Sequence, residues 1–582
     1  MKTDYDVVII GAGGAGLSAA LGASKKGGPK VKIAVLSKTH PLRGYTGSVQ
    51  GGICAALGNI EEDKTEWHAF DTVKGGDYLV DQYAAQVLSE EAIQVVNDLE
   101  TSGLPFIKTR DGKIDQRRFG GHTKNFGITP VYRSCYTANR TDQMILQPLY
   151  QRCIQNNVEF LNDFHLIDIL MDGNRCHGVA VLEIETGEIH IFRAKAVLLA
   201  TGGFGNMYRT TSNTYANTGD GPAVLARHGF FLEDMEFFQF HPTGIHSIGS
   251  LITEGVRSEG GILRNKNGEN FMKNYAPLLL DLAPRDIISR AMFMELKNGN
   301  GLSGDNNGDE YIHLDLTHLG KDTLKKRLPD MTDFCKTYLK LDPAEKPIPV
   351  QPSAHYAMGG IPTDIDGCVQ LNIRGDLIDG LYAAGECACI SVHGANSLGS
   401  NSLAETLVFG KRAGLHIQEY LKNSYQKTKD SFNDEHYKGY LDKIKAASGK
   451  IKADSLRNKM KNLMMDNVGI YRSGFSIEVA LEQLKELRHD IKHVKVTDSN
   501  ANYNTELMAR IELENLLDLS VITSASALNR NESRGAHARE DFPERNDNEY
   551  LMHTFTKFNK EEIFIDWKPV DISLWVPKTR EY

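Results

Sequence analysis

Hydrophobic positions at the start of the chain fall into short apolar runs separated by segments with helical spacing. The first run, Val7 to Ile10, has the length and composition of a buried parallel strand. Helical spacing follows from Ala15 to Lys26. A second strand is predicted from Val31 to Leu36, after the turn residues Gly27-Gly28-Pro29. This order of strand, helix and strand predicts a βαβ unit.

The turn between the first strand and the helix has the pattern Gly11-x-Gly13-x-x-Gly16. Glycines let the backbone approach a pyrophosphate, and the helix N-terminus offers free N–H groups and a positive dipole. Such a pattern alone can be a structural turn, but its place between a strand and a helix favours a nucleotide cofactor. The first candidate cofactor residues are therefore Gly11, Gly13, Gly14 and Gly16, with Ser37 and Lys38 at the end of the second strand.

The remaining pattern predicts a mixture of helices and strands. Helical spacing extends from Asp81 to Glu100 and from Gln143 to Asn156. A hairpin is predicted where two strand-like runs flank Glu185-Thr186-Gly187. Arg117 to Thr123 is polar and glycine-rich, and we predict a loop there. Residues 420 to 530 are charged and periodic and lack proline, which predicts a helical bundle.

Composition indicates an ordinary globular protein. The 582 residues have room for about four domains. A hydrophobic fraction of 41% and a charged fraction of 24% are typical of water-soluble proteins. The net charge of −9 argues against nucleic acid as a partner. The apolar runs are too short to cross a bilayer. The chain enters a core strand within about six residues, so we expect no signal peptide.

The eight cysteines are scattered and form no CxxC pair. This spacing predicts reduced thiols, and neither an iron–sulfur cluster nor another metal site is expected in this chain.

Several motifs occur in a fixed order over some 300 residues: HPTG from His241, TEGVR from Thr253, PRD from Pro284, HYAMGG from His355, AAGE from Ala383, HGAN from His393 and ESRGAHARED from Glu532. In this order they resemble the flavoprotein subunits of the succinate dehydrogenase and fumarate reductase family. The resemblance implies an α/β fold, in which a Rossmann-like FAD-binding domain carries an inserted α+β capping domain and is followed by a C-terminal helical domain. The expected boundaries are 1–239 and 351–420 for the FAD-binding domain, 240–350 for the capping domain, 421–545 for the helical domain and 546–582 for a tail.

The resemblance also implies FAD as the cofactor. Most members of the family carry a histidine, covalently bound to the flavin, where this chain has Tyr45. We therefore expect FAD to be held without a covalent bond, and a tyrosyl link is the alternative. The further cofactor-binding residues that the resemblance implies are Tyr45, Thr46, Gln50, Gly51, Gly52, Ala200, Thr201, Gly202, Asp220, Glu386, Asn401, Ser402 and Leu403.

The catalytic residues expected from the resemblance surround a four-carbon dicarboxylate. His241 and His355 grip the substrate, Thr253 contacts one carboxylate, and Arg285 donates the proton when fumarate is reduced. Glu254 and Arg257 match the proton relay of the family, and Phe119 lies in a loop that closes over the substrate. Taken singly, each residue has a structural alternative, such as a core histidine or a salt bridge between Arg285 and Asp286.

One departure concerns the substrate. The family has an arginine after HGAN that clamps a substrate carboxylate, and this chain has Ser397 there. We expect a fumarate reductase or succinate dehydrogenase subunit that exchanges hydride at FAD N5 and works as a reductase. The first alternative is a related oxidoreductase such as L-aspartate oxidase. The second is a flavin electron-transfer subunit without turnover of its own, which the loss of the arginine would favour.

The expected partners follow from the same resemblance. They are an iron–sulfur subunit that receives the electrons, one or more membrane anchor subunits that bind quinone, and fumarate or succinate as substrate. The chain is expected on the cytoplasmic side of the inner or plasma membrane, held there through its partner subunits.

Overall fold

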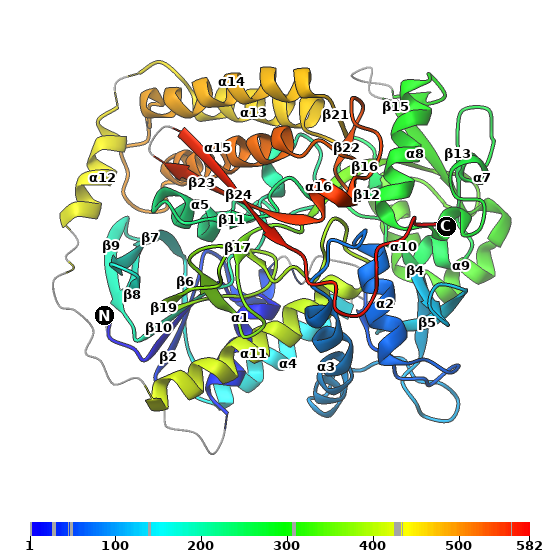
Figure 1. Ribbon diagram of the computed structural model, residues 1–582, viewed down its shortest axis with the longest axis horizontal. Helices are drawn as coiled ribbons and strands as arrows, with labels where there is room; N and C mark the ends of the chain where they lie inside the picture. Colours follow the sequence, from blue (N-terminus) through cyan, green and yellow to red (C-terminus); the bar gives the residue numbers. More distant parts are fainter. Residues whose placement is uncertain are drawn as a thin grey trace.

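The computed structural model describes residues 3–25, 31–44, 46, 51–137, 141–304, 310–423, 432, 435–447, 449–559 and 562–581; side chains are described from residue 144 in the helix that begins at 141. In Figure 1 a central sheet lies at the left, residues 245–350 lie at the right, and the long helices of the C-terminal part lie above the sheet.

The central sheet contains nine of the described strands, with the main order β6-β2-β1-β10-β19-β8-β7. From β6 to β8 neighbouring strands are parallel, so Ile10 lies between Leu36 and Leu199 in the register. The bounds of the nine strands are β1 Val7–Ile10, β2 Ile33–Ser37, β6 Glu159–Asn162, β7 Phe164–Asp172, β8 Arg175–Glu183, β9 Glu188–Arg193, β10 Ala196–Leu199, β18 Cys368–Gln370 and β19 Leu377–Ala383. The inner strands β1, β2 and β10 are buried, as parallel strands usually are, whereas the edge strand β6 is partly exposed. The predicted βαβ unit and the β8–β9 hairpin are confirmed.

Helices α1 (Gly14–Ala23) and α11 (Asn401–Asn423) pack closely beside this sheet. A Cβ on Gly414 would lie 2.1 Å from the carbonyl oxygen of Ala19, so only glycine permits this approach. Three more helices complete this side: α2 (Thr65–Gly75), α3 (Gln82–Thr101) and α4 (Thr141–Gln155).

The predicted loop from Arg117 to Thr123 is wrong in its secondary structure. It forms strand β4 (Gln116–Lys124), which pairs with β5 (Thr129–Cys135) and, through β5, with β3 (Ile53–Cys54). The pairing register shifts between Arg118 and Thr123, and Gly121 has φ +81° there. Polar sequence and glycines therefore mark an irregular strand.

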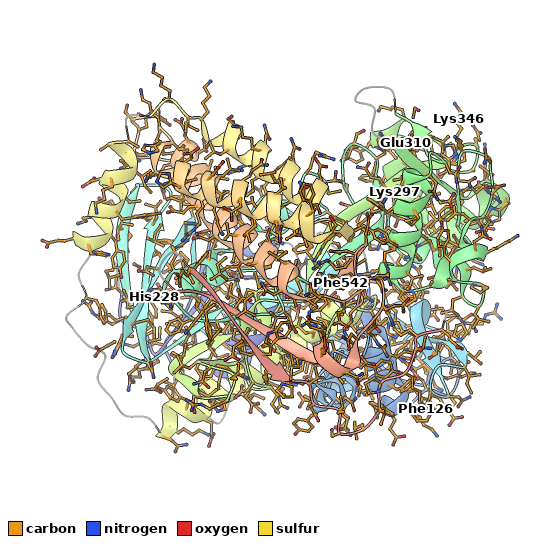
Figure 2. The ribbon with its side chains drawn as sticks, turned by 45° about the horizontal axis from the view of Figure 1, so that its top comes forward. Phe126, His228, Lys297, Glu310, Lys346 and Phe542 are labelled. Atoms are coloured by element: carbon orange, nitrogen blue, oxygen red, sulfur yellow. The ribbon has the colours of Figure 1, made fainter. Side chains whose placement is uncertain are left out.

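Residues 245–350 enclose a hydrophobic core of their own, and we call this part the inserted unit. It lies to the right in Figure 1, and Lys297, Glu310 and Lys346 mark it in Figure 2. Its own strands are β13 (Ile262–Arg264), β14 (Leu302–Ser303) and β15 (Glu310–Asp315), and they continue a sheet whose strands β12 (Phe238–Ile245) and β16 (Ile348–Ala357) enter and leave the unit. Its helices are α6 (Gly255–Ser258), α7 (Met272–Tyr275), α8 (Arg285–Lys297), α9 (Lys321–Arg327) and α10 (Pro329–Phe334).

The C-terminal part begins with four described helices, as the periodic pattern predicts. They are α12 (Glu435–Lys445), α13 (Ala453–Asn467), α14 (Gly474–Asp490) and α15 (Thr505–Asn529); α15 also packs on α5 (Asp220–Arg227). A hairpin of β23 (Met552–Asn559) and β24 (Glu562–Pro569) then pairs with β11 (Leu232–Glu233).

Short elements complete the described structure. They are β17 (Ile361–Pro362), β20 (Ala388–Cys389), β21 (Tyr471–Arg472), β22 (Ala538–Arg539), α16 (Asp547–Tyr550), the 3₁₀ turns η1 (Pro41–Arg43), η3 (Gly205–Met207), η4 (Leu280–Leu282), η5 (Thr317–Leu319) and η7 (Ile491–His493), and the π-helical turn η6 (Cys335–Leu339). Among the described residues, no helix combines the length and apolar character needed to cross a lipid bilayer.

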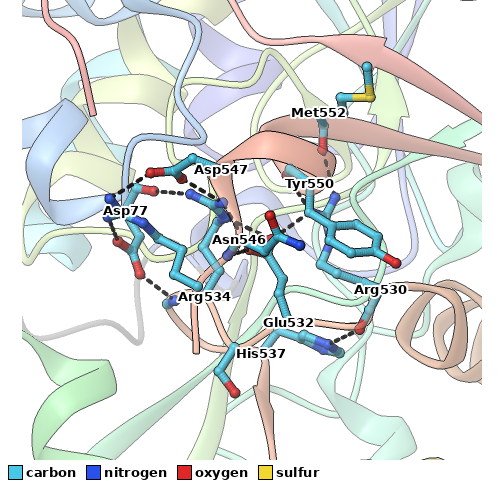
Figure 3. A network of polar contacts seen from close by, with 12 residues as sticks. Asp77, Arg530, Glu532, Arg534, His537, Asn546, Asp547, Tyr550 and Met552 are labelled. Carbon is cyan, nitrogen blue, oxygen red and sulfur yellow. Dashed lines mark hydrogen bonds and ion pairs between the residues drawn. The ribbon is translucent and has the colours of Figure 1, made fainter. Parts of the chain in front are cut away.

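The loop that starts at Glu532 is an internal brace. Arg530 and Arg534 are fully buried, and both donate to the carboxylate of Glu532 (Figure 3). Arg534 also reaches Asp547 at 2.9 Å and the backbone oxygen of Asp77 at 2.9 Å. Buried charges are tolerated when each is paired in this way. The loop therefore joins the C-terminal part to the end of α2.

Candidate active site

The glycine turn predicted from the sequence forms a cradle at the start of α1. Gly11 has φ +108°, and a Cβ there would lie 2.1 Å from the oxygen of Ala200. A Cβ on Gly16 would lie 2.0 Å from the oxygen of Gly11, so Gly16 shapes the turn from behind. The N-cap residue Gly13 adds no side-chain cap to the helix, and the N–H of Gly14 donates to Thr46 Oγ1 at 3.1 Å. The cradle leaves room for a pyrophosphate at the positive end of α1.

A cavity of about 1120 Å³ extends from this cradle, with its open mouth included. Its lining includes the glycine turn and, more than 300 residues later in the chain, His355 and Tyr356. The predicted cofactor residues that line it are Gly11, Gly13, Gly14, Ser37, Lys38, Thr46, Ala200, Thr201, Gly202, Asp220, Glu386, Ser402 and Leu403. Their chemistry fits FAD, and burial raises the pKa of Glu386 to about 8.

Lys38 is paired with carboxylates of the protein. Its ammonium lies 2.9 Å from Asp220 on α5 and 2.9 Å from Glu512 on α15. Burial opposes the charged ammonium, but Asp220 and Glu512 outweigh it and raise the pKa of Lys38. This triad ties the end of β2 to the helical part beside the cavity.

Other predicted cofactor residues lie behind the cavity wall. The amide of Asn401 donates to Thr72 at 2.9 Å, and its oxygen lies 2.9 Å from His68 Nε2, so it fixes the start of α11 to α2. Gly52 has φ +123° and lies against Ser134, and its neighbour Gly51 is not among the lining residues. The predictions for Tyr45 and Gln50 lie outside the described residues.

Arg285 is the centre of the predicted catalytic group. It is the first residue of α8, and its side chain is almost fully buried. Its Nε donates to Glu254 Oε2 at 2.8 Å, and one terminal nitrogen donates to Gln239 Oε1 at 2.9 Å. Two neutralising or accepting partners therefore hold the guanidinium in one orientation.

Glu254 connects three parts of the site. It accepts from Arg285, it accepts the N–H of Gly120 at 2.8 Å, and it lies 3.7 Å from Arg257. Burial acts to raise the pKa of Glu254, but Arg285 and Arg257 outweigh burial and hold the pKa below its ordinary value. Burial lowers the pKa of Arg257, whose guanidinium also donates to the backbone oxygen of Asp281. Arg285, Glu254 and Arg257 thus form one connected charged chain.

The two predicted histidines face each other, with ring centres 5.1 Å apart. The N–H of Thr243 donates to Nδ1 of His241, so the ring proton lies on Nε2. That Nε2 is buried and has no hydrogen-bond partner among the described residues. Burial and then Arg285 lower the pKa of both histidines well below the ordinary value. They act as neutral hydrogen-bonding groups.

The segments around Phe119 and Gly399 close this group on another side. Phe119 is buried, and a Cβ on Gly399 would lie 2.7 Å from its ring and 2.8 Å from Glu254 Oε2. Thr253 precedes Glu254, and its Oγ1 accepts the N–H of Gly255 at 3.3 Å. The structure therefore brings together all seven predicted catalytic residues: Phe119, His241, Thr253, Glu254, Arg257, Arg285 and His355.

The sequence analysis missed two residues of this group. Gln239 binds Arg285 through its oxygen and the backbone oxygen of Ser397 through its nitrogen, at 2.6 Å. Its two-residue spacing from His241 was an available signal, because residues two apart share one face of a strand. His393 is buried, and neither of its ring nitrogens has a hydrogen-bond partner among the described residues. Burial, followed by Arg285, lowers the pKa of His393 to about 3.

A fold with this glycine cradle, long cavity and adjoining charged group defines a flavin-binding oxidoreductase. A family model described as an FAD binding domain matches residues 6–403, and one described as the fumarate reductase flavoprotein C-terminus matches residues 457–582. The chain belongs to the succinate dehydrogenase and fumarate reductase flavoprotein family.

Named relatives agree with the family models. The succinate dehydrogenase flavoprotein subunit of Rickettsia bellii is 43% identical over 98% of this chain and 96% of its own length. The 8-methylmenaquinol:fumarate reductase flavoprotein subunit of Wolinella succinogenes is 38% identical over 99% and 92%. A solved structure, a mutant of E. coli quinol fumarate reductase FrdA, has a TM-score of 0.93 at 35% identity and covers 99% of this chain and 98% of its own.

Proposed function

We propose that this chain interconverts fumarate and succinate as the flavoprotein subunit of a respiratory complex, working as a reductase. The observation that carries the proposal is the placement of Arg285. Two side chains orient it, two neutral histidines adjoin it, and His355 also lines the cofactor cavity. A proton donor and hydrogen-bond donors thus meet at the end of the cavity where a flavin ring would lie.

We infer that FAD occupies the cavity without a covalent bond to the protein, because Tyr45 stands at the place of the family's linking histidine; when bound, FAD would supply the hydride exchange at N5. The residues that would hold it are the α1 cradle with Thr46, and Glu386, Ser402 and Leu403 at the other end. Ser402, Leu403 and Thr406 of the first turns of α11 line the cavity, so the positive end of this helix dipole also lies beside it.

The substrate is oriented by neutral donors. Nε2–H of His241 is buried without a protein partner among the described residues, so a carboxylate oxygen can accept it. His355 is steadied from behind by Ser212, whose Oγ lies 2.8 Å from Nδ1. Thr253 directly precedes Glu254 in the chain, and we infer that its hydroxyl contributes a further hydrogen bond to the substrate. Enclosure by these residues excludes water from the reacting carbons.

In the reduction, one carbon of the double bond receives a hydride and the other receives a proton from Arg285. Arg285 then regains a proton through Glu254 and Arg257, the next two residues of the charged chain. Glu254 is placed to pass a proton because it accepts a hydrogen bond from Arg285 and lies 3.7 Å from Arg257, while the N–H of Gly120 binds its other oxygen. Succinate oxidation runs through the same residues in reverse.

The electrons require a partner. The described cysteines are buried separate thiols, so we infer that an iron–sulfur subunit carries single electrons between this chain and membrane anchor subunits that bind quinone. These subunits would hold the chain at the cytoplasmic side of the inner or plasma membrane. Because the loop from Glu532 to Arg539 is mostly buried, we place the docking surface on the helical part instead.

Steady-state assays in both directions, with the purified complex and an artificial electron carrier, test this function. Arg285→Gln should retain FAD but lose at least about 100-fold in fumarate reduction. Arg374→Gln is the control, because Arg374 is an exposed residue paired with Asp376. Activity of Arg285→Gln within a few-fold of the unaltered protein would make Arg285 structural and refute the mechanism.

The second candidate is a flavin electron-transfer subunit without turnover of its own. Ser397 favours it, because the site lacks one carboxylate-binding arginine of the family pattern. If the purified, FAD-loaded complex turns over neither fumarate nor succinate, this candidate replaces the first proposal. Oxidation of aspartate by the same preparation, without turnover of succinate, would instead indicate an L-aspartate oxidase.

A further inference from the structure

The segment that follows β24 crosses the surface from the C-terminal hairpin to the inserted unit. It first binds the start of α3, where Gln82 accepts the N–H groups of Leu574 and Trp575 at 2.6 and 2.7 Å. The ring of Trp575 then packs edge-on against Phe70 of α2. In Figure 1 this last red segment passes α2 and ends beside the inserted unit.

Arg580, near the end of this segment, binds the end of α2 and the inserted unit at the same time. Its terminal nitrogen lies 3.0 Å from Asp77 and 2.7 Å from Asp286, and its other terminal nitrogen reaches the oxygen of Gly75 at 3.3 Å. Gly75 is the last residue of α2, and Asp77 follows this helix. Asp286 belongs to the first turn of α8. The side chain of Arg580 is only 6% exposed, so these contacts are shielded from water.

Asp286 is the direct neighbour of Arg285. Its side chain is completely buried, and one oxygen accepts from Arg580 and, at 3.3 Å, from Arg290. The other oxygen has no hydrogen-bond partner among the described residues. A buried carboxylate depends strongly on its cations, so loss of Arg580 would leave Asp286 poorly compensated. The first turn of α8 would then shift, and Arg285 would shift with it.

We propose that Arg580 is a positioning residue that clasps the start of α8 to the end of α2 and thereby holds Arg285 in its catalytic orientation. The catalytic part rests on the proposed function. The clasp joins α2 to the inserted unit, so a small displacement between them changes the approach of Arg285 to the substrate. A misplacement of about 1 Å can cost about 100-fold in rate.

Arg580→Gln in the full-length, FAD-loaded protein tests the clasp directly. Amide hydrogen exchange should accelerate about tenfold or more in the first turn of α8, where the N–H of Ile288 donates to Pro284. Arg374 is a surface residue that contacts neither α2 nor α8, so Arg374→Gln should leave that exchange unchanged. Unchanged exchange in Arg580→Gln would overturn the proposal whatever the substrate is.

Kinetics then separate positioning from plain stability. We expect kcat for fumarate reduction to fall about 10- to 100-fold, with KM within about threefold and FAD content unchanged. Guanidinium ion should restore part of the activity of Arg580→Ala, because it can occupy the vacated pair with Asp77 and Asp286. Faster exchange with normal kcat would reduce Arg580 to a structural role and overturn the positioning. Absence of fumarate turnover in the unaltered protein would instead refute the proposed function.

Discussion

Gly399 lies directly against the carboxylate of Glu254, so that a Cβ on Gly399 would be 2.8 Å from Oε2. The same Oε2 accepts the hydrogen bond from Arg285. No side chain fits between the segment after HGAN and the charged chain of the active site.

Gly399→Ala should therefore impair catalysis without removing FAD. The added methyl would lie 2.8 Å from Glu254 Oε2 and 3.2 Å from a terminal nitrogen of Arg285, so it disturbs the pair that orients Arg285. We expect fumarate reduction to fall about 10-fold or more, because the proton donor loses its orientation. Gly439→Ala is the control, since its Cβ would meet nothing within 4 Å. Equal activity of both variants, measured at equal FAD content, would show that the packing is not needed.

Ser397→Arg should tighten the binding of fumarate or succinate. Ser397 is buried, and its hydroxyl brings no charge to the site. Arg290, another candidate cation, pairs with Asp286, so it offers no evident compensation. One charge-assisted hydrogen bond contributes about 1.5–3 kcal/mol, which corresponds to about 10- to 100-fold in Kd. Titration followed by the flavin spectrum measures this; weaker binding together with lost activity would indicate a pocket shaped for another substrate.

Because of His553, the free energy of unfolding should fall as the pH rises into the alkaline range. It is fully buried, with Nδ1 2.6 Å from Asp234 and Nε2 3.3 Å from Asp81. Burial disfavours the charged ring, but Asp234 and Asp81 outweigh burial and raise the pKa of His553 to about 10. Because the folded pKa exceeds the unfolded value of about 6.5, the stabilisation is complete below pH 6.5 and disappears as the pH rises through 10. Urea unfolding of the unaltered protein and His553→Gln should differ most at pH 6 and least above pH 10, and a constant difference would contradict this account.

FAD should leave the protein on acid precipitation. The prediction rests on Tyr45, which stands where most family members have the histidine of the covalent link. All flavin should appear in the supernatant, and the band on a denaturing gel should show no flavin fluorescence. A fluorescent band would establish a covalent bond, and mass spectrometry of the peptide with Tyr45 would then identify the linked atom.

Local patterns predicted the parts of the molecule that depend on local chemistry. The strand, glycine turn and helix at the N-terminus follow from one short stretch, and the motifs around His241 and Arg285 marked the site. Gln239 was missed because its contact with Arg285 arises only when β12 meets α8. The contact of the Asn401 side chain with Thr72 of α2 likewise joins distant parts of the chain, so no local pattern shows it, and the cofactor-binding role of Asn401 stays a prediction. The β4 strand was taken for a loop because its polar residues and glycines suit an irregular edge.

The clasp at Arg580 also has a consequence for folding during synthesis. Arg580 binds the oxygen of Gly75, 505 residues earlier in the chain. While the ribosome is still making the C-terminal hairpin, the end of α2 and the first turn of α8 have already emerged, but their common partner has not. The early strands of the nascent chain can pair as they emerge. The contact between the end of α2, the first turn of α8 and Arg580 can form only after almost the last described residue has been synthesised.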